Sequence, residues 1–360
     1  MTEVVSIKID GRTVAARTGE TVLRAAERAG VTIPTLCDDK RLDPAGACRA
    51  CLVEVKGQRR LQPSCHWQVQ PDMEVSTDAT SERVKRHQNV LVSMYMADHR
   101  LDDTGLPVET AAEPGNALRD WAKSSESLPL EPVDAPRVAR PGDKNPYITF
   151  QPDLCVLCAR CTRYCDEVEG VNAITLTDRG SATTIGTSGM TGLLDTTCEL
   201  CGGCIDTCPT GALVETKSLN ILPRDVEKVR TTCNYCGVGC QMDLNVKDDK
   251  VVRVTSPEPG TTLNDGNLCI KGRFAYDFIH HQDRFTEPMV RGQDGKLHPT
   301  TWEHAIQTAA EGLKRIARKH GQDAIGFVSS SRCTGEENYL VQKIARAAFA
   351  TGNVHQCSAT

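Results

Sequence analysis

Sixteen of the eighteen cysteines in this 360-residue chain fall into four groups, and their spacing constrains the fold more than any other feature. Thiolates are the soft ligands that iron–sulfur clusters require, and Cys-x-x-Cys loops let consecutive ligands surround one cluster. We therefore expect each group to hold one cluster, in a chain that conducts electrons. The groups are Cys37, Cys48, Cys51 and Cys65; Cys155, Cys158, Cys161 and Cys165; Cys198, Cys201, Cys204 and Cys208; and Cys233, Cys236, Cys240 and Cys269.

Two other cysteine chemistries compete with this interpretation, a disulfide framework and zinc sites. Residues 1–6 lack the basic and apolar segments of a signal peptide, and no apolar run approaches the length of a membrane span. This predicts a reducing, cytoplasmic location, which disfavours disulfides. An isolated Cys-x-x-Cys pair is a fair zinc site, but two successive Cys-x2-Cys-x2-Cys-x3-Cys runs favour iron–sulfur clusters.

Length and charge limit the remaining classes of function. A chain of 360 residues has room for two to four domains. The formal net charge of −5 provides no basic surface for nucleic acid, and the aromatic content of 4% offers few stacking platforms for bases. We therefore expect no nucleic-acid partner, and no membrane segment of the chain's own.

Residues 1–80 predict a small domain around the first cysteine group. Its order of hairpin, helix, cysteine loop, strand and late cysteine resembles the β-grasp [2Fe–2S] ferredoxin domain of complex I, hydrogenase and formate dehydrogenase subunits. The spacing Cys-x10-Cys-x2-Cys-x13-Cys fits that family. The predicted elements are strands at Val4–Ile9 and Thr13–Ala15 joined by Asp10-Gly11, a helix over 21–29 capped by Thr18 or Thr21 and stopped by Gly30, and a strand at Leu52–Val55.

Residues 81–145 predict a helix over 81–100 and then a linker rich in Pro, Ala, Glu and Ser. The expected apolar face of the helix consists of Val84, Val90, Leu91, Met94 and Tyr95. In several of the subunits that this chain resembles, a His-x3-Cys segment at this point supplies the first ligands of a histidine-ligated [4Fe–4S] cluster. Here Asp103 stands in place of that cysteine, so the resemblance implies that this cluster is absent and that His99 is structural.

Residues 146–222 carry the second and third cysteine groups as an internal repeat, which predicts a dicluster [4Fe–4S] ferredoxin-like domain. In bacterial ferredoxins the fourth cysteine of each run ligates the other cluster. Asp166 follows Cys165 where proline is commoner, without removing a ligand. The crossed assignment gives one cluster Cys155, Cys158, Cys161 and Cys208, and gives the other Cys198, Cys201, Cys204 and Cys165.

Residues 223–285 contain Cys-x2-Cys-x3-Cys-x28-Cys followed by Lys271-Gly-Arg, with strands predicted at 242–246 and 251–254. This pattern resembles the N-terminal [4Fe–4S] domain of molybdenum or tungsten bis-pterin oxidoreductases. Residues 274–281 and 334–339 are similar to cytoplasmic formate dehydrogenase α subunits. The resemblance implies that Lys271 binds between cluster and pterin as an electron relay, whereas a solvated surface lysine is the ordinary alternative.

Residues 286–360 predict the beginning of an α/β pterin-binding domain, truncated at the chain end. Helices are expected over 302–320 and 337–350, with a buried strand over 324–328 between them. In the resembling family the metal-ligating Cys or selenocysteine follows a segment like 353–357, in which Cys357 matches a non-ligating cysteine. We therefore expect these residues to lack the metal ligand, to contain no catalytic residue and to be inactive alone.

Together these patterns predict an α+β multidomain protein. The resemblance implies the electron-transfer portion of a formate dehydrogenase α subunit, with one [2Fe–2S] and three [4Fe–4S] clusters. A molybdenum or tungsten bis-pterin guanine dinucleotide is expected only in the complete subunit, which would use formate and a flavin/NAD-binding Fe–S partner. The alternative is a non-catalytic Fe–S adaptor, complex I-like or hydrogenase-associated. The predicted domains are 1–80, a helix and linker over 81–145, 146–222, 223–285 and 286–360.

Overall fold

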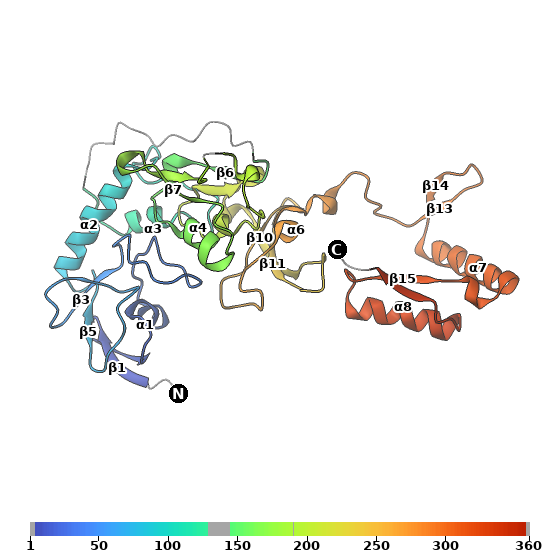
Figure 1. The fold of residues 1–360 in the computed structure, drawn as a ribbon, viewed down its shortest axis with the longest axis horizontal. Helices are drawn as coiled ribbons and strands as arrows, with labels where there is room; N and C mark the ends of the chain where they lie inside the picture. Colours follow the sequence, from blue (N-terminus) through green and yellow to red (C-terminus); the bar gives the residue numbers. More distant parts are fainter. Residues whose placement is uncertain (1–3, 129–144, 190, 358–360) are drawn as a thin grey trace.

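The computed structural model describes residues 4–128, 145–189 and 191–357. Figure 1 shows an elongated molecule, with the N-terminal sheet at one end and the unit around α7 and α8 at the other. The segments that carry the second, third and fourth cysteine groups lie between these ends, around α4 (Arg160–Arg163), α5 (Gly203–Asp206) and α6 (Ile270–Phe274). The domain boundaries given above stay a prediction, because the units also share packed contacts.

The N-terminal unit is a five-stranded sheet in the order β2-β1-β5-β3-β4. The predicted hairpin is confirmed, since β1 and β2 pair antiparallel with Ile7 opposite Val14. Its turn residues Asp10 and Gly11 both have positive φ, at 50° and 77°, as a two-residue type I′ turn requires. The elements are β1 (Val4–Ile9), β2 (Arg12–Arg17), α1 (Val22–Arg28), β3 (Leu52–Val55), β4 (Gln62–Pro63) and β5 (Glu74–Ser76).

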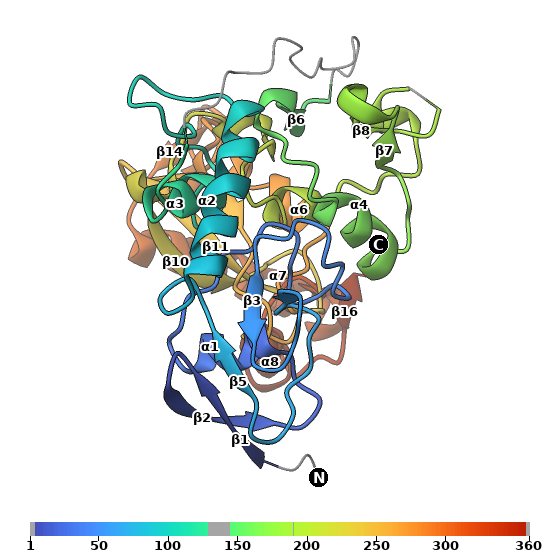
Figure 2. The ribbon, with the colours of Figure 1, turned by 90° about the vertical axis from the view of Figure 1, so that its left-hand side faces the viewer.

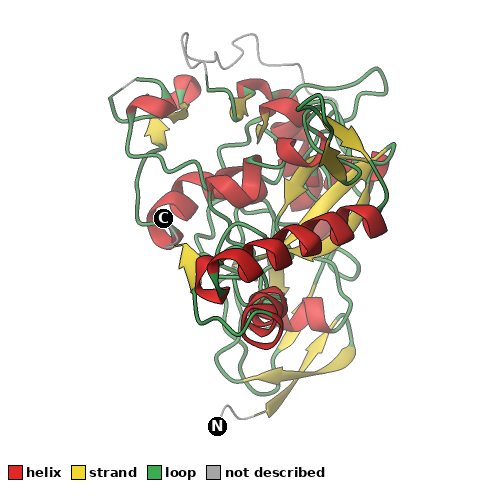
Figure 3. Cartoon of the chain, turned by 90° about the vertical axis from the view of Figure 1, so that its right-hand side faces the viewer, coloured by secondary structure: helices red, strands yellow, loops and turns green. Residues whose placement is uncertain are grey.

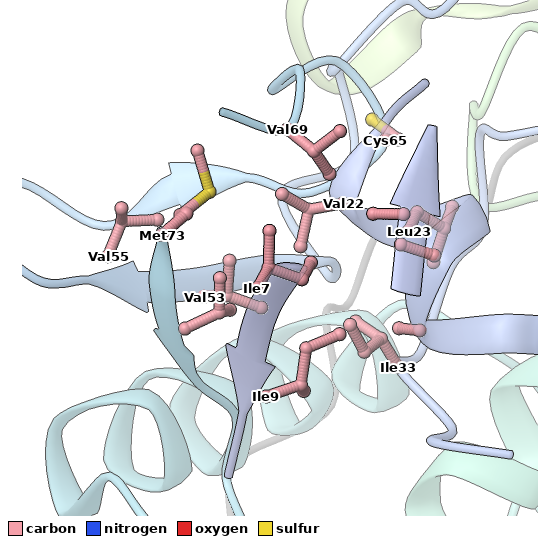
Figure 4. Packing of buried hydrophobic residues seen from close by; sticks show 14 of the residues in the cluster. Ile7, Ile9, Val22, Leu23, Ile33, Val53, Val55, Cys65, Val69 and Met73 are labelled. Atoms are coloured by element: carbon pink, nitrogen blue, oxygen red, sulfur yellow. The ribbon is translucent and has the colours of Figure 1, made fainter. Parts of the chain in front are cut away.

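Alternate residues of β1 form the core of this unit. Ile7 and Ile9 are buried while their neighbours in β1 face solvent. They pack with Val22 and Leu23 of α1 and with Val53 of β3, as Figure 4 shows. Of the two predicted caps, Thr21 is the one observed, because its hydroxyl accepts a hydrogen bond from the Arg24 N–H at 3.3 Å. This core holds the strand that follows Cys51.

The helix predicted over 81–100 is confirmed as α2 (Glu82–Ala97), but its predicted face is wrong in part. Val90 and Met94 are 41% and 58% exposed. The buried stripe includes Gln88 and Ser93 instead, and Ser93 is satisfied there by donating to the Asn89 carbonyl at 2.7 Å. A polar side chain with its own partner can therefore occupy a buried position that a hydrophobicity pattern assigns to an apolar residue. Figure 2 shows α2 rising from the sheet.

The predicted linker is more ordered than its composition suggests. It contains α3 (Ala117–Lys123), whose Trp121 is buried, and the Asn116 side chain caps this helix by accepting from the Leu118 N–H at 3.1 Å. The buried Arg253 guanidinium donates to the Ala111 carbonyl at 2.9 Å and pairs with Glu113. The segment before α3 is thus fixed by partners distant in sequence. Residues 129–144 of the predicted linker lie outside the described residues.

The two central units are built from short strands and single helical turns. Antiparallel pairing of β6 with β9 closes the second and third cysteine groups into one unit. In the next unit, β10, β11 and β12 form an antiparallel sheet, in which β11 and β12 were predicted and β10 was not. The elements are β6 (Ile148–Phe150), α4 (Arg160–Arg163), β7 (Thr175–Thr177), β8 (Thr184–Gly186), α5 (Gly203–Asp206), β9 (Leu213–Glu215), β10 (Glu227–Thr232), β11 (Gln241–Lys247), β12 (Lys250–Thr255) and α6 (Ile270–Phe274).

The last unit contains the predicted helix over 302–320 and a second helix that begins two residues earlier than predicted. The strand predicted over 324–328 lies further along the chain, and Val328 is 72% exposed, so it is not the buried strand expected. Figure 3 looks onto this end, with the two helices in front of the other units. The elements are β13 (Met289–Arg291), β14 (Leu297–Pro299), α7 (Trp302–His320), β15 (Phe327–Ser330), α8 (Gly335–Ala348) and β16 (Val354–Cys357), with β15 and β16 parallel.

No helix in the described part of the chain combines the length and the apolar character needed to cross a bilayer.

Candidate iron–sulfur sites

The four cysteines of the first group are all buried, between α1 and the β3–β4 hairpin. The Cys48 N–H lies 3.4 Å from the Cys37 Sγ. A hydrogen bond between these two thiols lowers the pKa of Cys37 to about 6 and raises that of Cys48. A matching bond from Cys65 lowers the pKa of Cys51 to about 7. The sequence group is therefore gathered into two adjacent sulfur pairs.

The second and third groups share the same local geometry, as their matched spacing predicts. Leu157 and Leu200 occupy equivalent positions with φ of 51° and 56°, in the left-handed region that side chains rarely adopt. This conformation aims the Leu157 N–H at the Cys155 Sγ and the Leu200 N–H at the Cys198 Sγ, each at 3.4 Å. The backbone is thus shaped to donate to sulfur twice, once in each half.

The fourth cysteine of each run lies with the opposite run. After burial, the charge of Cys208 is the largest influence that raises the pKa of Cys158, to about 12. Cys165 lines one cavity together with Cys198, Cys201 and Cys204. The Ala173 N–H donates to the Cys165 Sγ at 3.2 Å. The structure therefore brings together the two sets that crossed ligation requires.

These surroundings fit iron–sulfur clusters. Burial raises the pKa of Cys201 to about 12 and the pKa of Cys161 and Cys204 well above the usual value, so each thiolate needs a nearby cation such as iron. Backbone N–H groups aimed at sulfur are the donors that tune such clusters. Among the residues that the structure describes, no group of three or more Cys, His, Asp or Glu side chains is arranged so that it could hold a single metal ion.

The fourth group is more open than the others. Cys236 and Cys269 are exposed, and Cys233 and Cys240 are half-buried. The Cys233 N–H donates to the Cys240 carbonyl at 2.7 Å, which closes the loop between β10 and β11. Burial raises the pKa of Cys233, a backbone hydrogen bond from Tyr235 lowers it, and the charge of Cys269 raises it. Burial also raises the pKa of Cys240 and Cys269 adds to that rise, so the distant fourth cysteine lies near both of these residues.

Lys271 lies on α6, two residues after Cys269, and its side chain is exposed. A Cβ on the next residue, Gly272, would lie in ordinary van der Waals contact with the Cys233 Sγ, at 3.6 Å. Lys271 is therefore next to the fourth group and open to an added molecule. Its predicted role as a relay stays a prediction.

His99 follows the C-terminal end of α2 and is buried, and its Nδ1 lies 2.9 Å from the Arg100 carbonyl oxygen. The Asp103 side chain, which stands where the resemblance places a cysteine, is exposed. His99 is thus anchored to backbone, and its structural role remains a prediction. Outside the four groups, Cys333 is exposed.

The first and second groups are neighbours in one apolar cluster. Cys37 and Cys48 are buried there with Val156, and Cys158 packs against the same cluster. The loop of the first domain therefore lies directly against the loop of the second group. The order along the molecule at this junction matches the order in the chain.

The third and fourth groups are joined by α6. Ile270 and Phe274, which follow Cys269, belong to the apolar cluster that contains Cys198 and Cys204. The four sets thus form a continuous series from the N-terminal sheet to the β10–β12 sheet.

Charged residues around these groups were missed by the pattern of cysteines. Asp39 and Arg273 have buried side chains, and Arg160 has a partly buried one, and all three connect different units. Tyr164 precedes Cys165, is 1% exposed and donates from its hydroxyl to Asn267. The sequence signal available was only that charged or tyrosyl residues stand between cysteines, which is also the pattern of an exposed loop.

Four family models match successive parts of the chain. They are the 2Fe-2S iron-sulfur cluster binding domain over 2–80, the NADH-quinone oxidoreductase subunit 3 ferredoxin-like domain over 145–214, the molybdopterin oxidoreductase Fe4S4 domain over 226–281 and the molybdopterin oxidoreductase domain over 284–360. The predicted fold class is confirmed. These matches support the interpretation that the chain corresponds to the N-terminal Fe–S region of the molybdopterin oxidoreductase family.

Similar proteins come from several complexes. The chain is 37% identical to the NADPH-Fe(3+) oxidoreductase subunit alpha of Geobacter sulfurreducens over 98% of its length, and 35% identical to an NADH-quinone oxidoreductase subunit of Rhizobium meliloti over 99%. It is 27% identical over 99% of its length to a putative formate dehydrogenase of Staphylococcus haemolyticus, and it covers 40%, 40% and 39% of these relatives. The chain therefore spans about two fifths of the length of these relatives.

One solved structure is similar over most of its own length. It is an NAD+-reducing [NiFe]-hydrogenase in the H2-reduced state, with a TM-score of 0.50 and 27% identity. The match covers 61% of this chain and 90% of the hydrogenase chain.

Proposed function

We propose that this N-terminal Fe–S region of a molybdopterin oxidoreductase-type subunit moves electrons between a pterin-metal site in the complete subunit and a nucleotide-oxidising or nucleotide-reducing partner. The observation that carries the proposal is the continuous series of four cysteine sets, each enclosed or flanked by backbone N–H donors. When bound, an iron–sulfur cluster accepts and releases single electrons. The residues described above hold the cysteines in place, and they bury all four cysteines of the first set.

The proposed ligands follow the sets that the fold gathers. The first set would hold a [2Fe–2S] cluster and each of the others a [4Fe–4S] cluster. The crossed partners Cys208 and Cys165 would complete the two central sites, because each lies with the opposite run. The fourth site would be held by Cys233, Cys236, Cys240 and Cys269, with Lys271 beside it as the contact to the pterin.

Iron and sulfide analysis tests this proposal. We expect one [2Fe–2S] and three [4Fe–4S] clusters, about 14 iron atoms per chain after anaerobic reconstitution. Reduced protein should show one [2Fe–2S] and three [4Fe–4S] signals by EPR. Stoichiometric zinc in any set, or a further [4Fe–4S] signal from His99, would contradict the assignment.

For the substrate of the complete subunit we propose formate. The support is the similarity of 274–281 and 334–339 to formate dehydrogenases, together with the relative whose name states putative formate dehydrogenase. Formate would lose two electrons to the metal site, and these would leave one at a time through this region. A flavin/NAD-binding subunit is the proposed partner, docked at the N-terminal domain next to the first site.

A second candidate is an Fe–S adaptor without pterin in an NAD(P)H-linked complex. It is favoured by relatives at 35–37% identity whose names state NADPH-Fe(3+) and NADH-quinone oxidoreductase. Metal and pterin analysis of the complete protein separates the two. Molybdenum or tungsten with pterin, plus formate-dependent reduction of the clusters, supports formate oxidation, whereas iron alone and reduction only by NAD(P)H supports the adaptor.

Replacing Lys271 by alanine in the complete enzyme is expected to slow reduction of the fourth site while all clusters remain assembled. Lys271 supplies no sulfur ligand, yet it lies two residues after Cys269 with its side chain exposed, so its ammonium can bond to a pterin there. Stopped-flow reduction by substrate should show cluster reduction lagging by roughly 10-fold or more.

Lys250→Ala serves as the control, because this exposed lysine lies on β12 and not on α6. Wild-type kinetics in Lys271→Ala would leave Lys271 as an ordinary surface lysine. Loss of iron in this variant would instead indicate a structural role.

A further inference from the structure

The short segment from Gly203 to Cys208 is bonded on two sides to buried charged residues. This segment begins with α5 and carries ligands of both central sites, Cys204 and Cys208. On one side it meets Asp39 from the loop of the first group. On the other it meets Arg273 from α6, just after the fourth group.

Asp39 connects the first unit to both halves of the central unit. Its side chain is only 3% exposed, and it accepts from the Arg160 guanidinium at 2.6 Å and from the Thr207 hydroxyl at 2.8 Å. Arg41 adds three more hydrogen bonds at 3.0 Å, two from its guanidinium and one from its backbone N–H. Burial raises the pKa of Asp39, but Arg41 and Arg160 outweigh it and hold the pKa well below the usual range. The carboxylate is therefore charged at any working pH.

The partners of Asp39 stand next to cluster ligands. Asp39 is two residues after Cys37, Arg160 lies between Cys158 and Cys161, and Thr207 immediately precedes Cys208. Arg163 strengthens the same junction by donating to the Cys37 carbonyl at 2.6 Å. A movement of Asp39 relative to Arg160 would therefore change the separation of the first and second sites.

Arg273 connects the fourth unit to the third group in the same manner. Its side chain is 2% exposed and forms a two-pronged pair with Asp206, with one hydrogen bond at 2.7 Å. Its Nε also donates to the Cys201 carbonyl at 3.3 Å. A Cβ on Gly202 would lie 2.8 Å from this Nε, which is too close. Position 202 therefore has to be glycine, because the guanidinium occupies the space that a Cβ would need.

These buried ion pairs are better explained by the fixed geometry that they impose than by a contribution to folding stability. Taking charged groups out of water costs about as much as their attraction returns, so apolar residues would serve stability equally well. A bidentate arginine–carboxylate pair does fix direction and distance, which apolar contacts do not. Exposed pairs also link units, Lys40 of the first unit with Glu258 of the fourth and Lys217 of the central unit with Asp277 of the fourth, and these pairs lack this rigidity.

We propose that Asp39 and Arg273 are positioning residues that fix the separations between consecutive iron–sulfur sites, with Asp39 setting the gap from first to second and Arg273 the gap from third to fourth. This inference rests on the proposed function, because it requires clusters in these sets. Both residues act through α5 and the residues around it, so the central unit is the common reference for the whole series.

The test compares Asp39→Asn with Lys40→Gln, a neighbouring change that removes only an exposed ion pair of the same loop. In the reconstituted complete protein, Asp39→Asn should keep its full iron content. Pulsed EPR should show a broader distance distribution between the first and second sites. Electron equilibration between them should slow roughly 10-fold or more, the size typical of changes in groups that orient metal ligands. Lys40→Gln should match the wild type in all three measurements.

Redox potentials give a second readout with a defined sign. Loss of the Asp39 charge leaves Arg160 uncompensated beside Cys158, which stabilises the reduced, more negative site and shifts its midpoint potential upward. Arg273→Gln removes a positive charge beside Cys201 and should shift the third site downward, whereas Lys217→Gln should not. These shifts report the charge of each residue beside its site, whereas the distances and the kinetics report its positioning role.

The outcomes separate the two proposals. Unchanged distances, kinetics and potentials in fully loaded Asp39→Asn and Arg273→Gln overturn the positioning role while leaving the clusters assigned. Absence of clusters from the wild type overturns the proposed function itself. If Asp39→Asn fails to load iron, Thr207→Val replaces it, because this change removes one hydrogen bond of the carboxylate and keeps its charge. Wild-type distances and kinetics in loaded Thr207→Val then count against the proposal, and broadened distances with slower equilibration support it.

Discussion

Cys208→Ala is expected to abolish the cluster held by Cys155, Cys158 and Cys161 and to leave the cluster of its own run in place. Cys208 lies with the second group, where its charge raises the pKa of Cys158. Cys165, the fourth cysteine of the second run, lines the cavity of the third group and is not expected to replace the missing thiolate. The loss should be about four iron atoms per chain.

The assignment can be read from matched variants. The EPR signal missing from Cys208→Ala should be the signal missing from Cys158→Ala and should differ from the one missing from Cys201→Ala. Cys165→Ala should match Cys201→Ala. Cys333→Ala, a change at an exposed cysteine outside the groups, should retain all signals. If Cys208→Ala lost the same signal as Cys201→Ala, each run would bind its own cluster and crossed ligation would be wrong.

Among glycine-to-alanine substitutions in the central unit, Gly203→Ala is expected to be the most destabilising. A Cβ at Gly203 would overlap the ring of Tyr164, and the backbone there is not in the left-handed region, so the penalty is purely steric. The ring cannot easily withdraw, because its hydroxyl is bonded to Asn267 and its face lies 4.8 Å from the Arg41 guanidinium. We expect a loss of roughly 3 kcal/mol in the free energy of unfolding.

Gly312→Ala provides the matched control. Gly312 lies inside α7, and an added Cβ meets nothing within 4 Å. The same substitution there should raise stability by about 0.5–1 kcal/mol through helix propensity. Denaturant unfolding of the cluster-loaded protein measures both. Equal effects of the two substitutions would show that the contact between Gly203 and Tyr164 is loose.

Several elements could be predicted because their signals are local. The β1–β2 hairpin follows from strand alternation and an Asp-Gly turn, and α7 follows from its apolar periodicity with Thr301 as its cap. Elements that depend on distant partners were missed or displaced. β10 forms beside β11, β16 pairs in parallel with β15, and the short α3 has few local signals apart from its Asn116 cap.

The sequence by itself predicted the core of each group, because ligands spaced by two or three residues must lie near one another in any compact loop. It also determined the crossed pairing as an expectation, since repeated runs of this spacing share one fold. These inferences need no knowledge of how the units pack. The links of two or three residues depend on the reach of a few peptide bonds, whereas Cys65, Cys269 and the crossed pairing depend on the match of the whole spacing to known iron–sulfur domains.

Only the tertiary structure decided how the groups are held relative to one another. Asp39 meets Arg160 across 121 residues and Thr207 across 168, and none of these residues has a sequence pattern that separates it from a solvated surface residue. Whether a charged side chain is a surface residue or a rigid link depends on its burial and on its partner. Both arise only when distant segments pack, because desolvation and Coulomb attraction act through space and not along the chain.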